Sequence, residues 1–266
     1  MFYLCPKCGK SLTENDKTAR CESGHCYDRA KEGYYNLLLG SSGGNHGDNR
    51  EMVLARRDFL DTGAYKPLSD KIAEELAAFL KSGFLLDVGC GEGYYTDVMQ
   101  RALGDSVEIF GFDISKDAVR LASKRNRSVR LSVASAYKMP FADSSFDAVT
   151  NMFSPLAKDE IKRVLKPDGY FIMAIPGRDH LFGLKRAAYK NPYKNDVDDS
   201  ALEGFELLRS ESVKYTLNLS SNAEVRSLFM MTPYAYRTPR DDRERVLTLE
   251  SLETEVDFMI FVYKKL

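Results

Sequence analysis

The fold is decided by the stretch Leu86-Asp87-Val88-Gly89-Cys90-Gly91-Glu92-Gly93, which ends an apolar run and leads into a segment that can form a helix. Glycines at alternate positions allow a sharp backbone turn after a strand and leave no Cβ where a ligand must approach closely. A dinucleotide fingerprint needs G-x-G-x-x-G, but Tyr94 stands where its third glycine would be. The stretch therefore predicts a nucleotide-shaped cofactor site and disfavours NAD as its ligand.

A second acidic residue supports this prediction. The segment from Val107 to Phe112 reads as a strand, and Asp113 stands at its end, 24 residues after Gly89. A carboxylate there can accept hydrogen bonds from both hydroxyls of a ribose. The alternative is that Asp113 caps the helix that begins near Ser115. Because strand, loop, helix, strand and acid follow in the order of a Rossmann half, the ribose role is favoured.

The rest of the chain repeats short strand-like runs separated by helix-length segments. The predicted strands are Phe84 to Gly89, Val107 to Asp113, Val129 to Ala134, Phe146 to Met152 and Tyr170 to Ile175, with further strands at Ser212 to Leu219 and Val256 to Tyr263. The segment Leu165 to Gly169 reads as a turn that introduces the fifth run. This alternation predicts an α/β fold, a Rossmann-like, doubly wound and mostly parallel sheet.

Composition limits the partners. The 266 residues include 38 basic and 39 acidic side chains, so a nucleic-acid surface must be local. Two basic stretches qualify, residues 116–130 and 178–194, and the second is favoured because it follows His180. The apolar runs are far shorter than a membrane span and the N-terminus does not resemble a signal peptide, so we expect a cytoplasmic protein without membrane contact.

Four of the five cysteines precede residue 27. Cys5-Pro6-Lys7-Cys8-Gly9 has the form of a zinc knuckle, and Cys21 follows after a gap of 12 residues. Either His25 or Cys26 can supply the fourth ligand, and the spacing leaves this choice open. Zinc would supply the folding energy of a segment too small to bury a core of its own.

Several segments together carry a family resemblance. The glycine stretch is similar to the first motif of class I S-adenosylmethionine-dependent methyltransferases. Together with the cysteine knuckle, the segments 28–38 and 51–68, and Ile175 to Leu181, it resembles the RlmA family of 23S ribosomal RNA guanine-N1 methyltransferases. We accordingly expect a zinc-binding module at residues 1–36, a linker at 37–60 and a methyltransferase domain at 61–266.

The resemblance implies roles for single residues. Zinc would be held by Cys5, Cys8, Cys21 and His25, and the cofactor S-adenosylmethionine would be contacted at Tyr65, Gly91, Glu92 and His180. The cofactor site predicted from the glycine stretch and the second acidic residue adds Asp87, Gly89, Gly93 and Asp113.

The substrate would be N1 of a guanine in a hairpin loop of 23S ribosomal RNA. Removal of the N1 proton requires a base or water near the end of the fourth strand, and the sequence names no catalytic residue for it. The alternative is a quinone- or lipid-type small-molecule methyltransferase with an accessory zinc module, and a homodimer is left open.

Overall fold

The protein is described by a computed structural model that covers residues 3–40, 47–197 and 201–266. Its strands are β1 (Thr13–Glu14), β2 (Thr18–Arg20), β3 (Cys26–Asp28), β4 (Tyr35–Asn36), β5 (Gly83–Val88), β6 (Val107–Asp113), β7 (Arg130–Val133), β8 (Phe146–Met152), β9 (Leu165–Pro176), β10 (Phe205–Leu219) and β11 (Leu252–Lys265). Its α-helices are α1 (Arg50–Leu60), α2 (Lys66–Phe79), α3 (Tyr94–Leu103), α4 (Lys116–Arg125), α5 (Lys158–Val164), α6 (Phe182–Ala188), α7 (Asn222–Met230), α8 (Tyr234–Arg237) and α9 (Arg240–Leu247).

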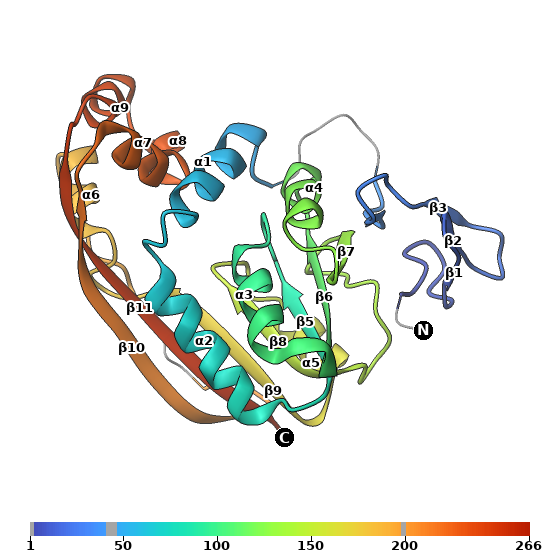
Figure 1. Ribbon diagram of the computed structural model, residues 1–266. Helices are drawn as coiled ribbons and strands as arrows, with labels where there is room; N and C mark the ends of the chain where they lie inside the picture. Colours follow the sequence, from blue (N-terminus) through green and yellow to red (C-terminus); the bar gives the residue numbers. More distant parts are fainter. Residues whose placement is uncertain (1–2, 41–46, 198–200) are drawn as a thin grey trace.

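One eight-stranded sheet carries the main body, in the order β10-β11-β9-β8-β5-β6-β7-β4 (Figure 1). The strands from β9 to β4 run parallel to their neighbours, whereas β11 and β10 add antiparallel strands beyond β9. The chain moves outward from β5 in one direction through β6 and β7 and in the other through β8 and β9. This arrangement confirms the predicted Rossmann-like, mostly parallel sheet, and it makes the carboxyl ends of β5 and β8 the expected ligand position.

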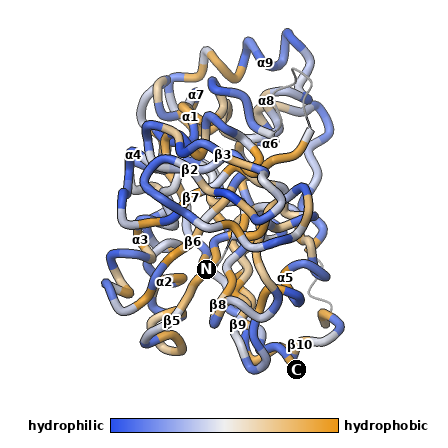
Figure 2. Tube along the Cα trace, turned by 90° about the vertical axis from the view of Figure 1, so that its right-hand side faces the viewer, coloured by the Kyte–Doolittle hydropathy of each residue, from blue (hydrophilic) through white to orange (hydrophobic). Residues whose placement is uncertain are grey.

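Both faces of the sheet are buried. Leu85 and Ile109 belong to one hydrophobic cluster, and their neighbours Leu86 and Phe110 belong to a second. Adjacent residues of a strand point to opposite faces, so the two clusters are the two sides of the sheet. Figure 2 shows hydrophobic, orange stretches around β8 and β9, and the run Phe171, Ile172, Met173 and Ala174 of β9 is buried.

The N-terminal cysteine-rich segment forms a small sheet of β1, β2 and β3 at the side of α4 and β7 (Figure 1). It is joined to the main body through buried contacts. Tyr3 is 1% exposed and packs on the rings of Phe110 and Phe141, and β4 pairs in parallel with β7. The segment therefore adds both an edge strand and core side chains to the large sheet.

The predicted strands are present, with one change in the fifth. The expected turn at Leu165 to Gly169 lies inside β9, where Phe146 pairs with Leu165 but Ala148 pairs with Tyr170. The residues between the two pairings bulge out of the ladder, with Asp168 in the left-handed region at φ 60°. The expected turn at Leu165 to Gly169 is thus a bulge within the longer strand β9.

Residues 50–60 differ from the linker expected over 37–60, because they form helix α1. Asn49 caps this helix by accepting a hydrogen bond from the amide of Met52, and Val53, Phe59 and Leu60 are buried. Helix α1 packs on α7 and on α4 near the carboxyl ends of the strands. Residues 41–46 of the expected linker lie outside the described residues.

Within the described ranges, every helix is too short or too polar to cross a bilayer.

Candidate functional site

A cavity of about 460 Å³ opens at the carboxyl ends of β5, β6, β7 and β8. Its wall is formed by the glycine stretch, by the segments that follow β6, β7 and β8, and by α1 and the start of α3; among the lining residues are Met52, Arg56, Gly89, Gly91, Glu92, Tyr94, Tyr95, Asp113, Ile114, Ala136, Tyr137, Phe153 and Ser154. The position and size are those of a small-molecule site in an open α/β sheet.

The glycine stretch turns in the left-handed region at three positions. Gly89, Gly91 and Gly93 have φ values of 72°, 55° and 89°. A Cβ on Gly89 would stand 2.2 Å from Ser154 Oγ, and one on Gly93 would stand 2.9 Å from the Cβ of Ala122 in α4. A Cβ on Gly91 would have only Arg56 within 4 Å, at 3.9 Å. Gly89 and Gly93 are thus required by close packing, and Gly91 keeps the cavity floor open to a ligand.

Asp113 holds the cavity wall together. Its Oδ2 accepts a hydrogen bond from the Gly91 amide at 3.1 Å, and its Oδ1 accepts one from the Ser115 amide at 2.7 Å. Ser115, rather than Asp113, is the N-cap of α4. Each carboxylate oxygen retains acceptor capacity toward a ligand, and burial raises the pKa of Asp113 above its ordinary value. The residue therefore has the position and chemistry expected for a ribose contact.

Asp87 lies behind the cavity rather than in its wall. It is 1% exposed and accepts hydrogen bonds from the hydroxyls of Thr96, at 2.5 Å, and Thr150, at 3.0 Å. Burial raises the pKa of Asp87 to about 6. The residue joins β5, α3 and β8 from beneath and so shapes the glycine turn indirectly.

Glu92 is held by an arginine that the sequence analysis did not single out. Arg125 of α4 donates to Glu92 Oε2 from Nε at 3.0 Å and from Nη2 at 2.7 Å, and it also reaches Asp61 at 2.8 Å. Glu92 Oε1 is buried and has no hydrogen-bond partner among the described residues. An unpaired carboxylate oxygen in a cavity-lining residue fits a ligand that carries a hydrogen-bond donor or a cation.

Tyr65 and His180 come together, 115 residues apart in the chain, with Tyr65 Oη 3.4 Å from His180 Nε2. They are 3% and 6% exposed, and both pack on the ring of Phe258. Burial lowers the pKa of His180 to about 3, so its imidazole is neutral near neutral pH. Neither residue is among those that line the cavity, although Phe258, on which both pack, contacts the ring of the cavity-lining Phe153.

The segment after β8 supplies the side of the cavity opposite the ribose position. The Asn151 side chain donates to the carbonyl of Pro155 at 3.2 Å and so closes the turn. Phe153 lies in the left-handed region at φ 57°, and 40% of it is exposed at the cavity. A non-glycine residue held in this conformation is typical of a functional site. Residues 151–157 contain no carboxylate and no imidazole that could act as a base.

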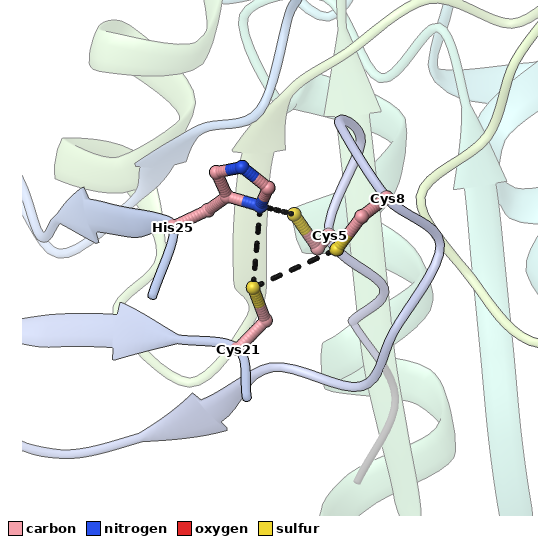
Figure 3. Close-up of side chains that lie close together, drawn as sticks. All are labelled: Cys5, Cys8, Cys21 and His25. Carbon is pink, nitrogen blue, oxygen red and sulfur yellow. Dashed lines mark hydrogen bonds between the residues drawn. The ribbon is translucent and has the colours of Figure 1, made fainter. Parts of the chain in front are cut away.

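A second site lies in the N-terminal segment, where Cys5, Cys8, Cys21 and His25 point toward one another (Figure 3). The Sγ atoms of Cys8 and Cys21 are 3.7 Å apart, and His25 Nδ1 lies 3.5 Å from Cys5 Sγ and 3.4 Å from Cys21 Sγ. A tetrahedral zinc site gives about 3.8 Å between two sulfurs and about 3.5 Å between sulfur and nitrogen. These four residues therefore fit a zinc ion without rearrangement.

Cys26 stands apart from this cluster. It is exposed on β3, and its Sγ lies 3.9 Å from Arg20 Nη2. The three-residue spacer between Cys21 and His25 thus places the imidazole, rather than the second thiol, beside the other ligands.

Basic side chains are distributed differently from the sequence expectation. In the favoured stretch, residues 178–194, Lys185 is buried, Arg186 pairs with Glu255 and Lys194 pairs with Asp179. The protein thus engages three of the five cations of this stretch itself.

The other basic stretch borders a polar cleft of about 900 Å³ between the cysteine-rich segment and the α4–β7 connection. Four of its basic lining residues are Arg29, Lys31, Lys124 and Arg127. The cleft also contains the carboxylates Glu14, Asp16 and Glu32. Its cations Lys31, Lys124 and Arg127 make no ion pair among the described residues, which makes it a candidate surface for phosphate groups beside residues 178–194.

Comparison with known proteins places both parts of the chain. Residues 3–39 match the family model "RlmA, N-terminal", and residues 86–173 match the model "Methyltransferase domain". A protein of Bacillus subtilis (strain 168) named "Putative 23S rRNA (guanine-N(1)-)-methyltransferase YxjB" is 32% identical over 99% of this chain and 97% of its own length. The 23S rRNA (guanine(748)-N(1))-methyltransferase of Streptomyces fradiae is 30% identical over 94% of this chain and 92% of its own.

A different class of relative matches only part of the chain. A demethylmenaquinone methyltransferase of Bacillus licheniformis is 32% identical over 116 residues, which are 40% of this chain and 50% of that enzyme. Similarity to enzymes acting on quinones therefore covers much less of the chain than similarity to enzymes acting on ribosomal RNA.

Proposed function

The chain belongs to the RlmA family of 23S ribosomal RNA guanine-N1 methyltransferases, and from this membership we propose a role for each of its two sites. The enzyme uses S-adenosylmethionine and carries zinc. The target we propose is N1 of a guanine in a hairpin loop, where an unpaired base can be turned outward. The observation that carries this proposal is the cavity at the carboxyl ends of β5, β6, β7 and β8, floored by the glycine stretch and bordered by Asp113.

The cofactor would lie across the glycine stretch. Asp113 would accept hydrogen bonds from the ribose hydroxyls, while Gly89 and Gly91 let the backbone approach and Glu92 faces the amino-acid end. Asp87 and Gly93 shape this turn from behind, through Thr96, Thr150 and the packing of α3 on α4. Tyr65 and His180, the further cofactor contacts that the family resemblance implies, would complete this end of the site, since Tyr65 is close to the cavity-lining Tyr95.

The acceptor base would approach from the side of Phe153. S-adenosylmethionine supplies an activated methyl group on a sulfonium, so the protein needs to align the acceptor and exclude bulk water. The exposed ring of Phe153 offers a face for stacking of a base. Because residues 151–157 provide no base, we assign acceptance of the N1 proton to water held at this turn.

The zinc-binding module, residues 1–36, would contribute to RNA binding through the cleft that it shares with α4 and β7. Among the described residues, Lys31, Lys124 and Arg127 of this cleft form no ion pair and can meet phosphates. The catalytic domain in this proposal begins at α1 rather than at residue 61, since α1 lines the cavity. Ribosomal RNA as substrate would place the enzyme in the cytoplasm.

We further propose that two copies associate as a homodimer along β10. This strand is an edge of the sheet, 15 residues long, with Leu207 and Leu208 about two-fifths exposed. The unpaired backbone groups of this edge, together with the two leucines, would meet the second copy. Light scattering of the purified protein tests this, and a monomer mass at assay concentrations would reject it.

The function is tested by incubating the protein with labelled S-adenosylmethionine and unmodified 23S ribosomal RNA, followed by nucleoside analysis. The expected product is labelled 1-methylguanosine. A parallel reaction with quinone and lipid acceptors tests the alternative class. Transfer to those acceptors with none to RNA, despite cofactor binding, would replace the RNA proposal by the small-molecule one.

A further inference from the structure

Tyr95 presents a hydroxyl donor that the protein leaves without an acceptor. Its residue lines the cofactor cavity in the first turn of α3, and its Oη is buried with no hydrogen-bond partner among the described residues. The ring is fixed edge-on to Tyr94 at 5.2 Å and lies 6.0 Å from the ring of Phe153. A buried unpaired hydroxyl costs free energy, so its persistence at a cavity wall points to a ligand atom as its partner.

The neighbouring Tyr65 also has a hydroxyl hydrogen without an acceptor, because the tautomer of His180 makes the imidazole the donor of the bond between them. The backbone amide of Asp257 donates to His180 Nδ1 at 3.4 Å, so this nitrogen carries no hydrogen. A neutral imidazole then carries its hydrogen on Nε2 and donates it to Tyr65 Oη. The Tyr65 hydroxyl accepts this bond, and its own hydrogen has no acceptor among the described residues.

Both hydroxyls stay protonated. Burial, and after it the proximity of Tyr65, holds the pKa of Tyr95 well above its ordinary value. Burial also raises the pKa of Tyr65. The ligand atoms that they meet must therefore be acceptors, and an anionic oxygen makes the strongest such bond.

The cofactor's amino-acid end matches these groups. It carries one carboxylate, which only accepts hydrogen bonds, and one ammonium, which only donates them. Two residues of the cavity wall offer the complementary pair, Tyr95 through its unpaired hydroxyl and Glu92 through its unpaired Oε1. The Tyr65 hydroxyl lies outside the lining but close to Tyr95. Burial raises the pKa of Glu92, and the two hydrogen bonds from Arg125 to Oε2 oppose this rise and favour the carboxylate form beside the ammonium.

We infer that Tyr95 is a cofactor-binding residue, whose hydroxyl donates to the carboxylate of S-adenosylmethionine next to the hydroxyl of Tyr65. This assignment rests on the proposed function, since it places the amino-acid end of the cofactor at this side of the cavity. It gives the otherwise unpaired Tyr95 hydroxyl a partner and explains why a tyrosine rather than a phenylalanine stands there.

The test compares two ligands that differ only in the carboxylate, S-adenosylmethionine and its decarboxylated form. Calorimetry on Tyr95→Phe should show affinity for S-adenosylmethionine reduced by about tenfold or more, as expected for a lost hydrogen bond to a charged group. Affinity for the decarboxylated form should stay within about twofold of wild type. Tyr189→Phe, which removes a hydroxyl outside the cavity, should leave both affinities unchanged.

Each other outcome rejects the assignment. Unchanged affinity of Tyr95→Phe for S-adenosylmethionine would show that the hydroxyl does not meet the cofactor, and an equal loss for both ligands would show a structural role only. The melting temperature without ligand should not fall, because the removed hydroxyl has no partner in the protein. If wild type binds neither ligand, the proposed function fails, and that result is distinct from a failure of the Tyr95 assignment.

Discussion

Replacing His180 with glutamine should make the stability of the protein less sensitive to acid. Burial lowers the pKa of His180 to about 3 in the folded state, whereas an unfolded histidine titrates near 6.5. Between these values the unfolded chain binds a proton that the folded protein excludes. The contribution of His180 to stability is therefore fully present above about pH 6.5 and is lost progressively as the pH falls toward 3.

The size of the effect follows from the two pKa values. At about pH 5 the unfolded state gains about 2 kcal/mol from protonation of this one side chain, and at about pH 8 it gains almost nothing. Glutamine can accept from the Asp257 amide and donate to Tyr65, but it does not titrate. The free energy of unfolding of His180→Gln, measured relative to wild type, should therefore be about 2 kcal/mol higher at about pH 5 than at about pH 8.

Urea unfolding measured by tyrosine fluorescence is suited to this comparison, because the chain has 15 tyrosines and no tryptophan. The pKa of Asp87, raised to about 6 by burial, acts in the opposite direction, since its contribution is lost as the pH rises from about 4 to 6. This term is common to both proteins and cancels in the difference. A difference between variant and wild type that is the same at both pH values would refute the assignment of a buried, neutral His180.

Three further substitutions test the two sites. Cys8→Ser should release zinc, measured by metal analysis, and should lower the melting temperature. Its cofactor affinity should stay within about twofold of wild type, because the described residues that line the cavity begin at residue 47. Loss of cofactor binding together with zinc would contradict the division into two sites. Asp113→Ala should weaken S-adenosylmethionine binding about tenfold or more in calorimetry, and unchanged affinity would remove its ribose role. Gly89→Ala should abolish measurable cofactor binding, because its Cβ would collide with Ser154. Gly104→Ala, in open space but at φ 66° and ψ −163°, a backbone region restricted to glycine, should lower stability and yet keep normal binding. Equal binding by the two variants would show that the collision is unimportant.

Local sequence signals were sufficient for the parts of the fold whose cause is local. Alternating glycines after an apolar run predicted the turn between β5 and α3, and the position of Asp113 after β6 predicted its place in the cavity wall. The zinc ligands Cys5, Cys8 and Cys21 follow from local spacing in the same way, whereas His25 was implied by the family resemblance. Local spacing does not decide between His25 and Cys26 as the fourth ligand. The direction in which β3 starts at Cys26 decides it, since it leaves His25 in the cluster and Cys26 exposed.

Other features depend on contacts between distant segments. The glycine-rich stretch before helix α1 favours a linker over residues 37–60, whereas Asn49 as an N-cap and the apolar positions Val53 and Phe59 are the local signals of the helix. The burial of His180 against Phe258 of β11 could not be read from either segment alone. Tyr95 and Arg125 were missed for the same reason, because each acquires its importance from a partner that the sequence does not place beside it.

The two-residue strand β4 has a practical consequence for anyone who wishes to exchange zinc-binding modules between such enzymes. Because Tyr35 and Asn36 complete an edge of the catalytic sheet and Tyr3 fills its core, a donor module cannot be joined at a simple splice point in the linker. A working chimera must bring its own match for the exposed flank of β7 and for Phe110 and Phe141. A chimera should therefore fold only if the contacts between β4 and β7, and between Tyr3 and the rings of Phe110 and Phe141, are matched. The simplest way to match them is to take both sides of this interface from the same parent enzyme.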